Sequence, residues 1–84
     1  MKMLTDEQIK DNIRHNLDRL LTVRGWTQKE LATRASVKES VLSDVKLGKS
    51  VPGLSIAMRI AEALDITVDR LAADPPEKNS KRSA

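Results

Sequence analysis

The feature that most constrains the fold is the stretch from Trp26 to Gly48, whose pattern is that of two short helices joined by a tight turn. The first helix opens on a capping box, with Thr27 as N-cap and Glu30 three residues further on. The second helix is expected over about residues 38–47. It stops at Gly48, because glycine readily adopts the left-handed conformation that ends helices.

The second of these helices has two faces of different character. At 100° per residue, Val41, Leu42 and Val45 form one apolar arc. The opposite arc holds Glu39, Ser40, Ser43, Asp44, Lys46 and Leu47. A helix that packs on one side and carries short polar side chains on the other can be laid against another molecule. In a helix-turn-helix, that molecule is DNA and the contact is in the major groove.

One further helix is predicted before this pair and two are predicted after it. A long first helix starts at a second capping box, Thr5 and Gln8, and ends at Arg24-Gly25. Its apolar positions recur every three or four residues: Ile9, Ile13, Leu17, Leu20 and Leu21. The mixed charges of its polar face favour a core helix over a membrane-surface helix. In the next helix, the first of the central pair, the inward positions are Leu31, Ala32 and Ala35.

The C-terminal half completes an all-α, five-helix fold. A fourth helix is expected over residues 54–64, and Thr67 caps a short fifth helix, 68–73, that buries Val68 and Leu71. Pro75-Pro76 ends the fold. The sequence therefore predicts one compact domain over residues 1–73, with the two-helix motif at 27–48, and a flexible polar tail over 74–84.

Size and composition exclude several classes of protein. The chain has 84 residues, 39% of them hydrophobic and 1% aromatic, which predicts a small aliphatic core. Such a core supplies only about 3–5 kcal/mol, so self-association is expected. The absence of cysteine excludes disulfides and thiolate chemistry. No apolar run is long enough to span a membrane and no signal peptide is present, so a cytoplasmic protein is expected.

The positive charge is concentrated on the two-helix stretch. The chain carries a net charge of +3. Residues 24–49 hold an excess of three cations, from Arg24, Lys29, Arg34, Lys38, Lys46 and Lys49 against Glu30, Glu39 and Asp44. This distribution is compatible with binding a polyanion, and equally with a solvated basic face.

Two single residues have less specific interpretations. His15 is the only histidine, and without cysteine or a second histidine it indicates neither a metal site nor a catalytic one. Trp26 could stack on a base, but its place just before a capping box favours packing against Leu31 or the first helix. We expect no catalytic residue, metal or cofactor, and no enzyme activity.

The sequence resembles the Cro and phage-repressor type of helix-turn-helix domain, also called lambda-repressor-like or Xre-like. The resemblance rests on Thr27-Gln28-x-Glu30-Leu31-Ala32, Val37, Leu42-Ser43, Val45, Gly48-Lys49, Pro52 and the closing I-A-E-A-L-D-I-T-V-D-R-L. It covers roughly residues 10–73. The resemblance implies that the helix at 38–47 is a recognition helix and that the chain binds double-stranded DNA, usually as a two-fold dimer.

The same resemblance assigns roles to single residues. Gln28 would bond a backbone phosphate with help from the helix N-terminus. Lys49 and Ser50 would meet phosphates on the other side of the groove. The positions that read base edges, or lie near them, are Lys38, Glu39, Ser40, Ser43 and Asp44.

Three departures from the family pattern change these expectations. Ser36 stands where the turn usually holds glycine, so a positive φ is expected there at some energetic cost. Lys38 replaces the usual Ser or Thr N-cap. Glu39 and Asp44 are acidic on the face that approaches DNA; they could accept from cytosine N4, and they also repel phosphates. We expect Lys38 and Lys46 to offset their charge.

Two interpretations stay open at this stage. The chain is either a small DNA-binding regulator of bacterial or phage origin, a repressor, or a protein-interaction module such as an antitoxin-like partner, for which Leu47 and the acidic face argue. A homodimer is expected in the first case. Its apolar edge would come from the last two helices, through Leu71 with Val68 or Met58, or from the first helix.

Overall fold

A computed structural model describes residues 4–75, and within them it shows five helices and no strand. The helices are α1 (Asp6–Arg24), α2 (Gln28–Ala35), α3 (Glu39–Lys46), α4 (Leu54–Ala63) and α5 (Val68–Ala72). The prediction of an all-α, five-helix domain is confirmed. Of the expected C-terminal tail, residues 76–84 lie outside the described part.

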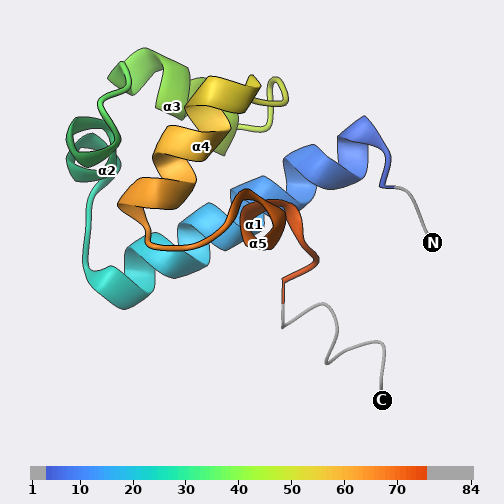
Figure 1. The fold of residues 1–84 in the computed structure, drawn as a ribbon, viewed down its shortest axis with the longest axis horizontal. Coiled ribbons are helices and arrows are strands. Elements are labelled where there is room, and N and C mark those ends of the chain that lie inside the picture. Colours follow the sequence, from blue (N-terminus) through green and yellow to red (C-terminus); the bar gives the residue numbers. More distant parts are fainter. Residues whose placement is uncertain (1–3, 76–84) are drawn as a thin grey trace.

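The longest helix, α1, packs directly against α3 and α5 (Figure 1). α5 lies against α1 near its middle, while α2, α3 and α4 gather on one side of it. α2 contacts both α3 and α4. α3 thus packs against α1 and α2, while α2 packs against α4, and the outer surface of α3 is left uncovered.

Local capping explains where α1 and α2 begin. The Thr5 hydroxyl accepts from the Gln8 amide at 3.1 Å, and the Gln8 side chain accepts from the Thr5 amide at 2.8 Å. Thr27 and Glu30 repeat this reciprocal pair at the start of α2. Both predicted capping boxes are confirmed, and α1 ends at Gly25 with φ 68°.

The turn between α2 and α3 adopts the strained conformation expected of it. Ser36 has φ 57° and ψ 42°, in the left-handed region. Its amide donates to the Thr33 carbonyl, and the Val37 amide donates to the Ala32 carbonyl at 3.0 Å. These two bonds satisfy carbonyls at the end of α2 and fix the direction in which the chain enters α3.

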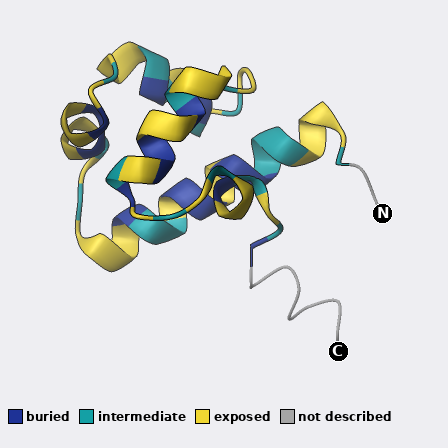
Figure 2. Ribbon diagram, viewed as in Figure 1, coloured by how far each residue is buried: buried dark blue, intermediate teal, exposed yellow. Residues whose placement is uncertain are grey.

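A single aliphatic core joins all five helices. Its buried members are Ile13, Leu17, Leu21, Leu31, Ala32, Ala35, Leu42, Val45, Ile60, Leu64 and Leu71. Those in α1, α2, α3 and α5 lie at the apolar positions predicted for these helices. Figure 2 shows these buried faces turned toward one another, with exposed residues along the outer sides of the helices. Trp26 is half-buried and packs against this core, as predicted. The guanidinium of Arg34 lies 4.3 Å from the centre of its ring.

Two asparagines in α1 anchor α5, and the sequence analysis did not identify them. Asn12 and Asn16 are buried. The Asn16 amide donates to the carbonyls of Leu71 at 2.7 Å and Ala73 at 2.9 Å, and the Asn12 amide donates to that of Ala72 at 3.0 Å. Since the last carbonyls of a helix have no partner inside it, these amides satisfy the end of α5.

The structure corrects three details of the C-terminal half and the recognition helix. α3 is one residue shorter at each end than expected, since Lys38 and Leu47 are its caps. α5 ends at Ala72, and Val68 is only half-buried. Leu71 is fully buried, so it cannot belong to an exposed dimer edge. Its side chain fills the core because the asparagine anchors hold α5 tightly against α1.

Candidate nucleic-acid interface

The uncovered surface of α3 carries the polar residues that the sequence analysis assigned to it. Glu39, Ser40 and Asp44 are exposed and Ser43 is half-buried. On the opposite side, Leu42 and Val45 are buried in the core. The 3.6-residue repeat produces this division, because apolar positions three and four apart fall on one side of the helix.

Lys46 does not belong to this surface, contrary to the sequence expectation. Its ammonium lies 3.1 Å from the Asp18 carboxylate on α1, and its side chain is only a quarter exposed. The flexible four-carbon stem allows a lysine near the border of a helix face to turn toward either side. Lys46 therefore ties α3 to α1 and does not offset the charge of Glu39 or Asp44.

Lys49, in place of Lys46, partly neutralises the charge of Asp44. The Lys49 ammonium lies 3.9 Å from the Asp44 carboxylate, with both side chains more than half exposed. Gly48, with φ 71°, turns the chain so that residue 49 comes back beside the end of α3. Ser50 follows it and is also exposed. The loop after α3 thus places a cation next to an acid of the outer surface.

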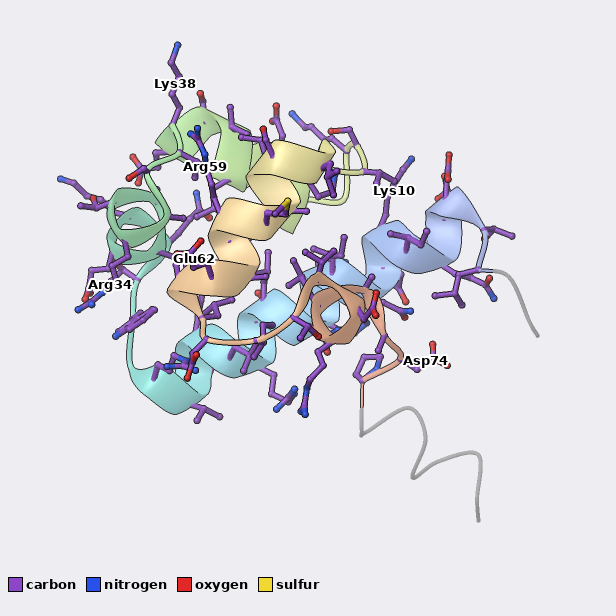
Figure 3. All side chains as sticks on the ribbon, viewed as in Figure 1. Lys10, Arg34, Lys38, Arg59, Glu62 and Asp74 are labelled. Atoms are coloured by element: carbon purple, nitrogen blue, oxygen red, sulfur yellow. The ribbon has the colours of Figure 1, made fainter. Side chains whose placement is uncertain are left out.

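The two N-terminal ends near this surface differ in their capping. Lys38 is the N-cap of α3 and makes no side-chain cap bond, as expected for a lysine. Its side chain points away from the molecule (Figure 3). Gln28 is the first residue of α2 and is half-buried. The Thr27 hydroxyl accepts from the Glu30 amide at this end of α2. The amides before Glu30 have no partner within the helix and can donate to an anion.

Arg59 supports the turn that sets the angle between α2 and α3, and the sequence analysis did not find it. From α4, its guanidinium donates to the Ser36 carbonyl at 3.2 Å. Figure 3 labels Arg59 on α4 and Arg34 on α2, and both residues line the same pocket. Because the donor and acceptor are 23 residues apart, no local pattern in the sequence indicates this contact.

A metal site and a membrane span find no support in the described residues. Within 4–75, no group of three or more metal-ligating side chains comes together. His15 is exposed, with its ring 3.6 Å from Asp11. None of the five helices is both long and apolar enough to cross a bilayer.

Comparison with known proteins identifies this arrangement. Residues 19–71 match the helix-turn-helix family of the Xre and lambda-repressor type. The chain belongs to this family. The matched span contains α2, the Ser36 turn and α3, together with α4 and nearly all of α5.

Two relatives agree with this assignment. The chain is 34% identical over 56 residues to an uncharacterized HTH-type transcriptional regulator, YazB, of Bacillus subtilis, covering 67% of this chain and 78% of the relative. The structure resembles the crystal structure of a hypothetical transcription factor, NHTF, from Neisseria, with a TM-score of 0.76 and 26% identity. That match covers 98% of this chain and 94% of the other. The family and these relatives make the chain a DNA-binding transcriptional regulator.

Proposed function

We propose that the chain is a sequence-specific regulator of double-stranded DNA, a repressor of bacterial or phage origin that acts in the cytoplasm as a homodimer. The observation that carries the proposal is the division of α3: one side is buried in the core, while Glu39, Ser40 and Asp44 lie uncovered on the other. Lys38 and Lys49 stand at its two ends, where a groove's phosphates would pass.

The site residues divide into two groups by the part of the duplex they would meet. Contacts to base edges are assigned to Lys38, Glu39, Ser40 and Asp44, with Ser43 beside them. Contacts to phosphates are assigned to Gln28 at the start of α2 and to Lys49 and Ser50 after α3. Phosphate contacts position the protein, whereas base contacts give it sequence preference.

The acidic residues give this surface its particular chemistry. A carboxylate accepts hydrogen bonds only, and cytosine N4 is the matching donor in the major groove. Glu39 and Asp44 therefore favour cytosine while they repel the phosphates of every sequence. Asp44 also attracts Lys49, at 3.9 Å, which removes part of a cation's charge from non-specific binding. We expect weak non-specific affinity together with marked discrimination between sequences.

Selection from a random duplex library tests the proposal. Purified protein should enrich an inverted repeat with half-sites about 34 Å apart, since a two-fold dimer reads successive turns of one face of the duplex. Glu39→Ala or Ser40→Ala should abolish the preference. Ser55→Ala, an equally simple change at an exposed position of α4, should leave it intact. Enrichment of no sequence by the native protein would refute the proposal.

One observation favours a second candidate function, binding of a protein partner through the same surface. Leu47 ends α3 and is 64% exposed beside Asp44, an apolar and acidic combination that suits a protein better than a phosphate backbone. The double variant Glu39→Lys, Asp44→Lys separates the two functions. It should bind random DNA more tightly in either case, but only a protein-interaction module would lose a partner that co-purifies with the native chain.

A further inference from the structure

A small cavity lies between α1 and the segment that contains α5, and an arginine lines each of its two walls. Arg19 comes from α1 and Arg70 from α5, which lies against α1 in Figure 1. The cavity has a volume of about 270 Å³. None of the described residues that line it belongs to α2, α3 or α4. The cavity is therefore separate from the surface assigned to DNA.

Arg19 carries a buried hydrogen-bond donor that lacks an acceptor. Its Nε atom is buried and donates to no acceptor among residues 4–75. A buried N–H without an acceptor is costly and uncommon in folded proteins. In a guanidinium the Nε–H lies parallel to an Nη–H, and these two donors together match the two oxygens of a carboxylate. The side chain of Arg19 is therefore suited to an anion with two acceptor oxygens.

The positive charge of the cavity is not balanced within the described part of the chain. There, neither the Arg19 nor the Arg70 guanidinium makes a hydrogen bond or an ion pair. Asp74 also lines the cavity, but it has an interaction of its own. The cavity thus has two cations on its walls, and an anion placed inside is attracted by both. Burial of the Arg19 Nε atom strengthens this attraction, because water screens it less.

The rest of the lining is apolar apart from Asn16. Leu20, Ile66 and Ala73 supply the apolar part, and the first two also pack against the core. The Asn16 amide donates to carbonyls on the opposite wall, including that of Arg70 at 3.3 Å, and so holds the two walls together. At about 30 Å³ per water molecule, the cavity has room for roughly nine groups of that size. A carboxylate joined to a short aliphatic chain matches both the volume and the lining.

We propose that this cavity binds a small organic anion, a carboxylate on an aliphatic body of a few carbons. The carboxylate accepts from Nε and one Nη of Arg19 and is attracted by Arg70, while the aliphatic body lies against Leu20 and Ile66. Because the ligand contacts both walls, it strengthens the attachment of α5 to α1. The inference goes beyond the proposed function, since this binding requires neither DNA nor a second copy of the chain.

Titration of the full chain with sodium hexanoate at constant ionic strength, followed by amide NMR spectra, tests the site. The chemical shifts should change saturably, with a Kd in the millimolar range or below. The largest changes should fall on the amides of Leu20, Ile66, Arg70 and Ala73. Hexanamide has the same shape without the charge, and it should bind about tenfold more weakly or worse. Sodium phosphate has the charge without the aliphatic body, and it should also bind about tenfold more weakly or worse.

Two variants separate the cavity from the general surface charge. Arg19→Met and Arg70→Gln should each weaken hexanoate binding by about tenfold or more. Arg14→Gln is the matched control and should bind like the native chain, because Arg14 lies on the same helix, pairs with Asp11 and does not line the cavity.

Thermal unfolding without hexanoate checks that the variants fold. Arg19→Met should melt at or above the native temperature, since it removes the buried donor that lacks an acceptor. Arg70→Gln should stay folded, since Arg70 is exposed. Shift changes that do not saturate, that spread over the whole surface or that persist in both variants would overturn the inference, as would phosphate binding as tight as that of hexanoate. None of these results bears on the DNA selection, whose failure would be recognised separately.

Discussion

Replacing Ser36 by glycine should stabilise the protein, which is the reverse of what glycine does at most positions. Ser36 holds φ 57° and ψ 42° at the turn between α2 and α3. The side chain is exposed, and the hydrogen bonds of this residue that fix the turn come from its backbone. Ser36→Gly therefore removes a Cβ from the left-handed region without removing any of these bonds.

The magnitude follows from two opposing terms. An L-residue in the left-handed region costs about 1–2 kcal/mol relative to the right-handed one. Glycine reduces that gain by about 0.5–1 kcal/mol, because the unfolded chain of the variant has more conformational freedom to lose on folding. The free energy of unfolding should rise by about 0.5–1 kcal/mol. In a domain of this size that corresponds to a melting temperature higher by roughly 2–8 °C.

Thermal and urea unfolding followed by circular dichroism measure this change. Ser43→Gly is the matched control, because Ser43 lies within α3 in ordinary helical conformation and should lose about 0.5–1 kcal/mol on the same substitution. Ser36→Ala, which keeps a Cβ, should give no gain. If Ser36→Gly melts at or below the native temperature, the strain assigned to this turn is absent and the reasoning fails.

Three further changes test other contacts. Asn16→Ala should lower the free energy of unfolding by about 2 kcal/mol or more in urea titrations, because it leaves carbonyls at the end of α5 without a donor; a loss below about 0.5 kcal/mol would contradict this anchor. Lys46→Ala should cost less than about 1 kcal/mol, since its partner Asp18 is half exposed. Asp44→Asn should free Lys49 for phosphate, raising non-specific DNA affinity and steepening the slope of log K against log salt by about 0.9; an unchanged slope would refute that role.

The helix ends were predictable because they depend on neighbours in the sequence. A capping box needs a hydroxyl and a Glu or Gln three residues later, and Thr5-Gln8 and Thr27-Glu30 supply both. The strain at Ser36 was also predictable, since the turn demands a left-handed residue whatever occupies it. The buried side of α3 followed from its apolar spacing.

Contacts between distant parts of the chain could not be predicted in the same way. Asn16 looks like one more polar residue of an amphipathic helix, yet its amide meets carbonyls more than 50 residues away. Arg59 reaches the Ser36 turn from another helix. Each contact depends on how the helices pack. Apolar periodicity predicts which face of a helix is buried, but it does not predict which polar groups meet there.

The electrostatics of the recognition surface show why this difference matters for function. A helical wheel places Lys46 on the same polar arc as Glu39 and Asp44, and the resulting surface looks neutral. Packing α3 against α1 turns Lys46 to Asp18, and the turn at Gly48 brings Lys49 back to Asp44 instead. Asp44 is thus paired with a cation, Lys49, for which DNA phosphates can compete. A cytosine that binds Asp44 and a phosphate that binds Lys49 would together break the Asp44–Lys49 ion pair. The proposed preference for cytosine and the affinity for the DNA backbone therefore depend on the same contact.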